Sequence, residues 1–336
     1  MKLSVIIPNY NRASTVTETI ENMLRQSRPP DEVIVVDDGS TDNSREVIRE
    51  FGQRVCLVEQ SNQGPGAARN AGLEVASGEF VQFMDSDDVA SLNKLELQLE
   101  TLTHTGADLA YCPWVRSEIC GGALRFCGPI LQSSALPAHK HMLEWALGEW
   151  CLVFQNCLFR RRILDQAGRF RTDMMVAEDT EYLIRVLLAG AHCVFTPGCL
   201  VFYRVNEDNQ LLKGGATSRR SAEDVSRFFE VAGQAVEPCL SRFHESTRRE
   251  TALRIFRHVR HCRRHKWREP DPESTLCRVT RSFPQWQLAI ADLWQRARRK
   301  FSTLTPETPM QPALAPTIPD AGHRILAESA GYVVMG

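Results

Sequence analysis

Three carboxylates fall within four positions at the end of an apolar segment, where residues 78–88 read GEFVQFMDSDD. Burying unpartnered carboxylates is costly, because the charged form loses its water and like charges repel each other. Hard divalent cations such as Mg²⁺ prefer carboxylate oxygens and keep coordination positions for water and phosphate oxygens. Asp85, Asp87 and Asp88 therefore predict a metal and diphosphate site. The alternative for this stretch is a simple loop in which Asp88 caps the next helix.

Two further acidic pairs could carry chemistry, although each has an ordinary structural explanation. Asp37 and Asp38 stand in VVDDGSTDNS, which alone is a common turn from a strand into a helix. Glu178 and Asp179 begin an amphipathic segment, where the helix macrodipole favours negative charge. The stretch GPGAARN matches neither the P-loop nor the dinucleotide-binding fingerprint. These patterns become informative only in combination.

The elements that must position these acids alternate regularly over residues 1–100. Apolar, β-branched runs predict strands at LSVIIP, DEVIVV, VCLVEQ and EFVQFM, and helical periodicity predicts a helix after each of the first three. This alternation predicts an α/β fold with a mostly parallel sheet flanked by helices. Because ligands of such sheets bind outside the carboxyl ends of the strands, the polar clusters at 9–11, 37–40 and 85–88 should converge on one site.

Beyond residue 109 the alternation fades into shorter strands and helices, of which the segment AEDTEYLIRVLLAG has the clearest helical pattern. A basic helical stretch follows, and five prolines between positions 306 and 319 predict an extended or poorly ordered end. The expected organisation is a domain at 1–220 with halves 1–108 and 109–220, a C-terminal helical extension at 221–304 and a tail at 305–336.

Composition limits the class of protein and its partners. The 336 residues are 43% apolar with a formal net charge of -1, which argues against a polyanionic partner for the whole molecule. Eleven cysteines include no C-x-x-C pair, and an odd count without a secretory leader predicts reduced thiols in the cytoplasm. No apolar run is long enough to span a membrane. Residues 241–300 nevertheless contain sixteen lysines and arginines against six acidic residues.

Taken together, the motif-bearing segments resemble the family 2 glycosyltransferases with the GT-A fold. The resemblance is carried by SVIIPNYNRASTVTETIENMLRQSRPPDEVIVVDDGSTDNS, by NQGPGAARNAGLEVASGEFVQFMDSDD and by AEDTEYLIRVLLAGA, in that order. It covers roughly residues 1–220. It implies transfer of a sugar from a nucleotide-sugar with inversion at the anomeric carbon, assisted by Mg²⁺ or Mn²⁺. It also implies a nucleotide-binding half at 1–108 and an acceptor-binding half at 109–220.

By position, the resemblance implies which residues hold the nucleotide. Pro8 and Tyr10 would line the base pocket, and Asp38 would accept a hydrogen bond from the base, typically uracil, with Asp37 as its support. Arg69 of AARN would face the nucleotide. A UDP-sugar donor is therefore expected.

The resemblance also implies the metal-binding and catalytic residues. Asp85, Ser86 and Asp87 match the D-x-D motif, with Asp85 towards the ribose and Asp87 on the metal. Asp179 matches the catalytic base, and Glu178 lies next to it.

The chemistry is sound without the resemblance. A sugar hydroxyl is a poor nucleophile, and a positioned carboxylate that takes its proton accelerates attack by about 10²- to 10⁴-fold. A divalent metal neutralises the charge that develops on the leaving nucleoside diphosphate. With the base and the metal on opposite faces of the anomeric carbon, direct displacement inverts that centre.

Two departures from the family pattern bear on function. Many relatives carry a histidine shortly after the strand that corresponds to LVFYR, but YRVNEDNQLLKGG contains none, so Arg204, Asn206 or Lys213 are candidates for diphosphate contacts. Because this histidine is absent, an alternative is that the protein is a non-catalytic relative that binds nucleotide-sugars or glycans. The Q-x-x-R-W motif of processive synthases is also absent, which predicts transfer of a single sugar to a glycan or lipid-linked acceptor in cell-surface polysaccharide or glycoconjugate synthesis.

The basic segment 241–300 suggests other partners. His258, His261 and His265 share one helical face and could hold zinc, but they stand in RHVRHCRRHKWR, where a solvated basic face is the better interpretation. Basic helices with interleaved aromatic residues could dock peripherally on the cytoplasmic face of an anionic membrane, which would suit a lipid-linked acceptor. A helical cap or a dimer contact is the alternative. Nucleic-acid binding is not expected, because no recognised module is present.

Overall fold

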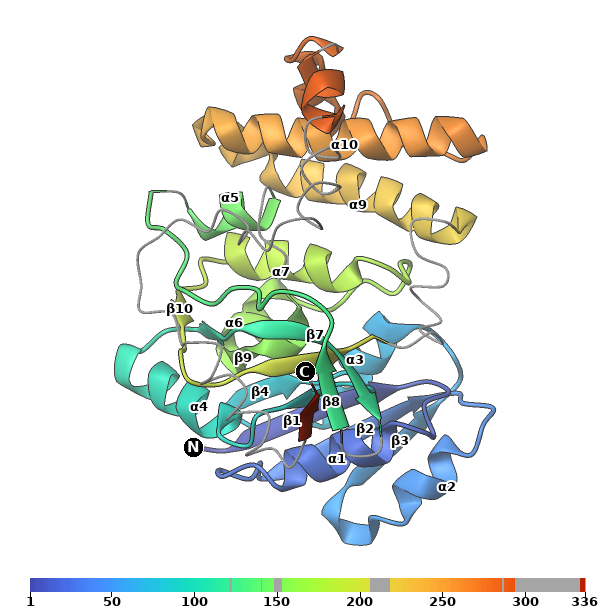
Figure 1. Ribbon diagram of the computed structural model, residues 1–336, viewed down its shortest axis with the longest axis vertical. Coiled ribbons are helices and arrows are strands. Elements are labelled where there is room, and N and C mark those ends of the chain that lie inside the picture. The colour runs from blue at the N-terminus through green and yellow to red at the C-terminus, as the bar shows by residue number, and fades with distance from the viewer. Residues whose placement is uncertain are drawn as a thin grey trace.

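A mixed β-sheet flanked by helices forms the centre of the computed structural model, which describes residues 1–120, 123–139, 141–147, 153–205, 218–285, 287–293 and 333–335 (Figure 1). Within these ranges the sheet has seven strands in the order β10-β6-β9-β4-β1-β2-β3. A smaller sheet, in the order β12-β8-β7-β11-β5, lies beside it. The predicted α/β fold with a mostly parallel sheet is confirmed.

Residues 1–108 contain the four predicted strands and the three predicted helices, together with further short elements. The parallel strands are β1 (Leu3–Asn9), β2 (Glu32–Asp38), β3 (Cys56–Gln60) and β4 (Phe80–Phe83). The helices that cover them are α1 (Val16–Leu24), α2 (Ser44–Arg49) and α3 (Pro65–Val75), followed by α4 (Lys94–Thr105), with the short 3₁₀ turn η1 at Gly52–Arg54. In β1, β2 and β4 almost every side chain is buried, because helices cover both faces of the sheet. Asn9 pairs with Asp37 in the register of β1 and β2, so their polar ends meet at the carboxyl edge.

The second half completes both sheets. Its strands are β6 (Leu109–Tyr111), β7 (Trp114–Cys120), β8 (Ala123–Phe126), β9 (Cys157–Arg160), β10 (Cys193–Phe195) and β11 (Val201–Arg204). Strand β11 also pairs with β5 (Val89–Ala90), which belongs to the first half. Strand β9 runs antiparallel between β4 and β6. The helical elements are α5 (Met142–Leu147), η2 (Phe154–Asn156), α6 (Arg161–Ala167) and α7 (Glu178–Leu188). Helix α7 begins at the predicted acidic pair, and Gly190 follows its end.

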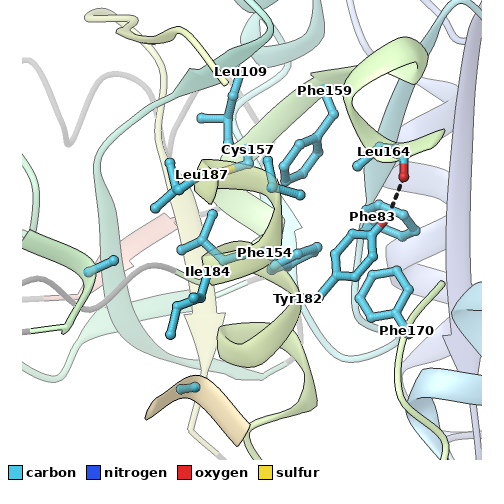
Figure 2. Close-up of a cluster of buried hydrophobic side chains, with 14 of the residues drawn as sticks. Phe83, Leu109, Phe154, Cys157, Phe159, Leu164, Phe170, Tyr182, Ile184 and Leu187 are labelled. Carbon is cyan, nitrogen blue, oxygen red and sulfur yellow. Dashed lines mark hydrogen bonds between the residues drawn. The ribbon is translucent and has the colours of Figure 1, made fainter. Parts of the chain in front are cut away.

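An aromatic cluster fixes α7 against the sheet (Figure 2). Tyr182 of α7 stacks on Phe170 with ring centroids 3.8 Å apart, and Phe83 of β4 meets the edge of Phe170 at 5.4 Å. The Tyr182 hydroxyl, which can donate one proton, lies within hydrogen-bonding distance of the carbonyl oxygens of Leu164 at 3.1 Å and Gly168 at 3.0 Å. Offset and edge-on aromatic contacts add to the energy of area burial. The start of α7 is thereby held at a defined place relative to the end of β4.

The C-terminal helices are stacked on this body. Helix α9 (Arg219–Val236) lies over α7, and α10 (Glu245–His265) crosses above α9 (Figure 1). The short elements η3 (Glu237–Arg242) and α11 (Thr275–Arg281) complete this part. Phe228 and Phe229 of α9 belong to the same buried apolar cluster as Leu183 and Ile184 of α7. Helix α9 therefore shares its core with the preceding domain, and the predicted boundary at residue 220 falls in its first turn.

Three other predictions concern the C-terminal part. Of the predicted tail, Val333–Met335 forms β12, parallel to β8, and residues 305–332 and 336 lie outside the described ranges. His258 was expected on a solvated face, but its Nε2 lies 2.8 Å from Ser226 Oγ, and burial lowers its pKa to about 4. That expectation is wrong for His258, because α10 turns this side chain towards α9. Among the described helices, none combines the length and the apolar character needed to cross a bilayer.

Candidate active site

The loops after β1 and β2 are joined by a buried polar network. Asn9 Nδ2 donates to Asp37 Oδ2 at 2.9 Å, and the Ser40 amide donates to Asp37 Oδ1 at 3.0 Å. Arg45 Nε lies 3.1 Å from the same Oδ1. Asp37 is fully buried, so its contacts are with the protein, and its role as the support of Asp38 stays a prediction.

Asp38 fastens the loop that enters α3. Its Oδ1 accepts hydrogen bonds from Gln60 Nε2 at 2.6 Å and from the Gln63 amide at 2.9 Å, and its Oδ2 accepts one from the Gly64 amide at 2.7 Å. Each carboxylate oxygen has two acceptor positions, so Oδ2 keeps one for a further donor. Tyr10, directly after the end of the neighbouring strand β1, is 38% exposed. The base contacts of Asp38, Tyr10 and the half-buried Pro8 stay predictions.

The acidic turn after β4 is organised by two residues from distant segments. Asp85 Oδ1 accepts a hydrogen bond from Arg69 Nη2 at 3.0 Å, and Asp85 Oδ2 accepts one from Gln155 Nε2 at 2.6 Å. The same Gln155 amide donates to Asp88 Oδ2 at 2.6 Å. Asp88 is buried, and its pKa is raised well above its ordinary value by burial and by the charges of Asp87 and Asp85. A cation in this turn would relieve that repulsion.

Asp87 is the carboxylate best disposed to meet a metal ion. Its Oδ2 accepts a hydrogen bond from Arg12 Nε at 3.2 Å, and within the described part of the chain its Oδ1 accepts none. Burial and the neighbouring Asp85 raise its pKa, and Arg12 opposes this. Ser86 is buried between the two acids, with its carbonyl oxygen accepting a hydrogen bond from Thr15 at 3.0 Å.

The donor set fits a hard divalent cation. The acidic turn offers carboxylate oxygens of Asp85 and Asp87, and Mg²⁺ is commonly held by one or two carboxylates together with substrate phosphates and water. In the ranges that the structure describes, no three histidine, cysteine or acidic side chains form a metal-binding group on their own. A bound Mg²⁺ or Mn²⁺ would therefore depend on the diphosphate for the rest of its ligands.

Arg69 connects the acidic turn to the start of α7. Its Nη1 donates to Glu178 Oε1 at 2.6 Å while its Nη2 binds Asp85, and its guanidinium lies over the Phe170 ring at 5.7 Å. Arg69 is only 4% exposed and lies between the two carboxylates, and its predicted contact with the nucleotide stays a prediction. Burial raises the pKa of Glu178 to about 7, although Arg69 opposes the shift and Asp179 adds to it.

Asp179 is the more accessible carboxylate at the start of α7. Its Oδ1 accepts hydrogen bonds from the Thr180 amide at 2.6 Å and the Thr180 hydroxyl at 3.2 Å, and the side chain is half-buried. Burial raises its pKa, and the charge of Arg69 opposes the rise. A carboxylate with a raised pKa is a stronger base than an exposed one. Ala177, two residues before Asp179, has a φ of 64°, a left-handed conformation that non-glycine residues rarely adopt.

Arg204, a candidate for diphosphate contacts, is bonded to the backbone of the acidic turn and to neighbouring segments. Its Nε donates to the Asp87 carbonyl oxygen at 2.6 Å and its Nη1 to the Ile119 carbonyl oxygen at 2.7 Å. It also forms an ion pair with Glu18, and its backbone amide donates to Asp88 Oδ1 at 2.7 Å. Asn206 and Lys213, the other two candidates, lie outside the described residues.

Two residues of this site escaped the sequence analysis. Gln155 is a buried polar residue within the apolar stretch CLVFQNCLF, and an amide in such a place is a signal that could have been followed. Arg12 lies in NYNRA, where nothing in the sequence alone indicates its contact with Asp87.

A mostly parallel sheet that gathers acidic turns at its carboxyl edge is the arrangement expected of a GT-A glycosyltransferase, and comparisons with known proteins point to the same class. Residues 4–168 match the model of glycosyl transferase family 2. The succinoglycan biosynthesis protein ExoO of Rhizobium meliloti is 30% identical over 212 residues, which cover 61% of this chain and 61% of that protein. This chain thus spans less than two thirds of that relative's length.

Two solved structures share the fold. The structure of TarS residues 1–349 of S. aureus with UDP has a TM-score of 0.55 and 20% identity, covering 77% of this chain and 72% of that one. The mannosyltransferase PcManGT of Pyrobaculum calidifontis, with GDP-Man and Mn²⁺, has a TM-score of 0.56 and 18% identity, covering 98% and 85%. At these identities the likeness concerns the fold alone.

Proposed function

We propose that this glycosyltransferase moves a single sugar from a nucleotide-sugar, most simply a UDP-sugar, to a glycan or lipid-linked acceptor with inversion, in a reaction that depends on Mg²⁺ or Mn²⁺. The observation that carries the proposal is the buried Arg69, whose two terminal nitrogens bind Asp85 at 3.0 Å and Glu178 at 2.6 Å. Through Arg69, the carboxylates suited to a metal and those suited to a base belong to one connected site.

In this mechanism Asp179 takes the proton of the acceptor hydroxyl as it attacks the anomeric carbon. Its half-buried position and raised pKa suit that role at neutral pH. Asp85 and Asp87 would hold the divalent ion, which when bound neutralises the charge that develops on the leaving nucleoside diphosphate. Glu178 stays paired with Arg69 and keeps the guanidinium between the two acidic segments.

Support for the donor and the pathway is indirect. The TarS structure holds UDP and the PcManGT structure holds GDP-Man with Mn²⁺, so the fold accepts either base and a metal ion in those proteins. The family resemblance of Asp38 and its loop favours UDP here. The name of the relative ExoO, a succinoglycan biosynthesis protein, supports a role in polysaccharide synthesis.

Peripheral membrane docking through residues 241–300 stays a prediction. Ion pairs made by arginines of α10 make it less favourable. Arg257 and Arg260 both pair with the buried Asp292, at 2.7 and 3.0 Å, and Arg263 pairs with Glu269 at 3.0 Å. These pairs reduce the charge that the segment can offer to anionic lipid. Liposome flotation with and without anionic lipid would measure what remains.

Calorimetric titration with UDP tests the proposal most directly. With Mn²⁺ we expect UDP binding that EDTA and Asp87→Ala each abolish. Asp179→Asn should retain UDP binding while losing nucleotide release from a panel of UDP-sugars. Metal-independent binding would contradict the metal assignment, and binding of GDP instead of UDP would contradict the base assignment. UDP binding without turnover on any donor would favour the non-catalytic alternative.

A further inference from the structure

The loop of residues 170–177, which leads into the acidic pair of α7, is held on one side by α3. A Cβ atom on Gly66 would lie 2.2 Å from the Arg171 carbonyl oxygen, and one on Gly64 would lie 2.5 Å from Met175 Sδ. Asn70 of α3 forms two hydrogen bonds with the backbone of Phe170, at 2.9 and 2.8 Å. The glycines and the asparagine of GPGAARN thus allow and fix the close approach of this loop.

The other side of the loop is held by α9 of the C-terminal extension. Asp224 Oδ2 accepts a hydrogen bond from the Met175 amide at 2.9 Å, and Asp224 is only 8% exposed. Arg227, one turn along α9, forms an ion pair with Asp173 at 2.7 Å. The backbone of the loop therefore lies between two helices that are about 150 residues apart in the chain.

The end of this loop adopts a conformation that needs such support. Ala177 has a φ of 64°, and Glu178 and Asp179 follow it directly. Left-handed conformations of non-glycine residues persist only where the surrounding structure over-determines them, and they gather at functional sites. If either side of the loop were released, Ala177 could relax and Asp179 would shift, since its carboxylate bonds only to the adjacent Thr180 among the described residues, whereas Glu178 is also held by Arg69.

We propose that Asp224 is a positioning residue, through which the C-terminal extension sets the place of Asp179. The proposal rests on the proposed function, in which Asp179 is the base. The proposal gives the C-terminal extension a part in catalysis, because α9 holds the loop of residues 170–177 in place in addition to capping the domain. Asp224 itself touches neither the acidic turn nor Glu178 in any described contact.

The test uses Asp224→Ala, Asp224→Asn and the control Glu223→Ala in the full-length protein. Asp224→Asn keeps an oxygen that can accept the Met175 amide, whereas Asp224→Ala does not. Glu223 is the neighbouring carboxylate and pairs with Arg219 within α9. For Asp224→Ala we expect kcat to fall about 10- to 100-fold, because small misplacements of a catalytic group have effects of that size. UDP affinity with Mn²⁺ should stay unchanged, and the other two variants should resemble wild type.

Hydrogen exchange of a peptide spanning 170–177 gives a readout that does not depend on turnover. Exchange should accelerate in Asp224→Ala and stay at the wild-type rate in Asp224→Asn and Glu223→Ala. Unchanged exchange, or unchanged kcat, in Asp224→Ala would overturn the proposal. So would a loss of kcat that is matched by a loss of UDP binding, since that indicates general unfolding. If the wild-type protein shows no turnover, the proposed function fails, and the exchange measurement still decides whether Asp224 holds the loop.

Discussion

Arg69 Nη1 and Glu178 Oε1 are 2.6 Å apart in a buried ion pair that joins α3 to α7 across 109 positions of the sequence. Both side chains are shielded from water, with side-chain exposures of 5% and 7%. A buried pair of this kind is weak evidence for stability, because desolvation offsets much of the attraction between the charges. Its geometric effect is clearer: it fixes the start of α7 relative to the acidic turn that Arg69 also binds.

Replacing Arg69 by methionine should destabilise the protein and abolish turnover. The substitution leaves Glu178 buried without its partner, and breaking such a pair costs about 3–5 kcal/mol. Urea unfolding measures the loss. The double variant Arg69→Met with Glu178→Gln should recover part of the stability but none of the activity. Strictly additive effects of the two substitutions on the free energy of unfolding would contradict a direct coupling.

The free energy of unfolding should fall as the pH rises from 4.5 to about 7, the ordinary and the folded-state pKa of Glu178. Burial raises the pKa of Glu178 in the folded protein from its ordinary 4.5 to about 7. The folded state therefore binds more protons than the unfolded state between these values, and linkage makes folding less favourable as pH increases across them. Unfolding in urea at pH 5, 6 and 7.5 should show the trend. Glu178→Gln should flatten it, and equal slopes in the two proteins would contradict the raised pKa.

Gln155→Leu should weaken metal-dependent UDP binding. The Gln155 amide donates to Asp85 and Asp88, each at 2.6 Å, and its loss removes one of the hydrogen bonds that orient each carboxylate. Residues that orient metal ligands typically change metal affinity by about 10- to 100-fold when they are removed. Titration with Mn²⁺ at fixed UDP measures the shift, with Gln53→Leu as an exposed control. An unchanged Mn²⁺ dependence would show that Asp85 needs no such support.

The parts of this fold that could be predicted from the sequence are those set by local pattern. Strands β1, β2 and β4 are continuous apolar runs because both faces of the sheet are covered, and their polar ends converge because parallel strands end on one edge. Gln155 could not be placed in this way, since it reaches the acidic turn only because the antiparallel β9 inserts between β4 and β6. The direction of the Arg69 side chain likewise depends on α7, which is remote in sequence.

Asp38→Asn separates two roles that the geometry allows for this residue. As a carboxylate, Asp38 accepts three hydrogen bonds from the loop before α3, whereas an asparagine has one acceptor oxygen and would turn an N–H group towards a donor. A buried donor left unsatisfied costs about 1–3 kcal/mol, so we expect a loss of stability of that order in urea unfolding. Competition between UDP and GDP then distinguishes the roles. If Asp38 contacts the base, UDP affinity should fall while GDP affinity does not. If Asp38 acts only by holding the Gly64 loop, both nucleotides should weaken by the same factor, and the predicted contact with uracil would be wrong.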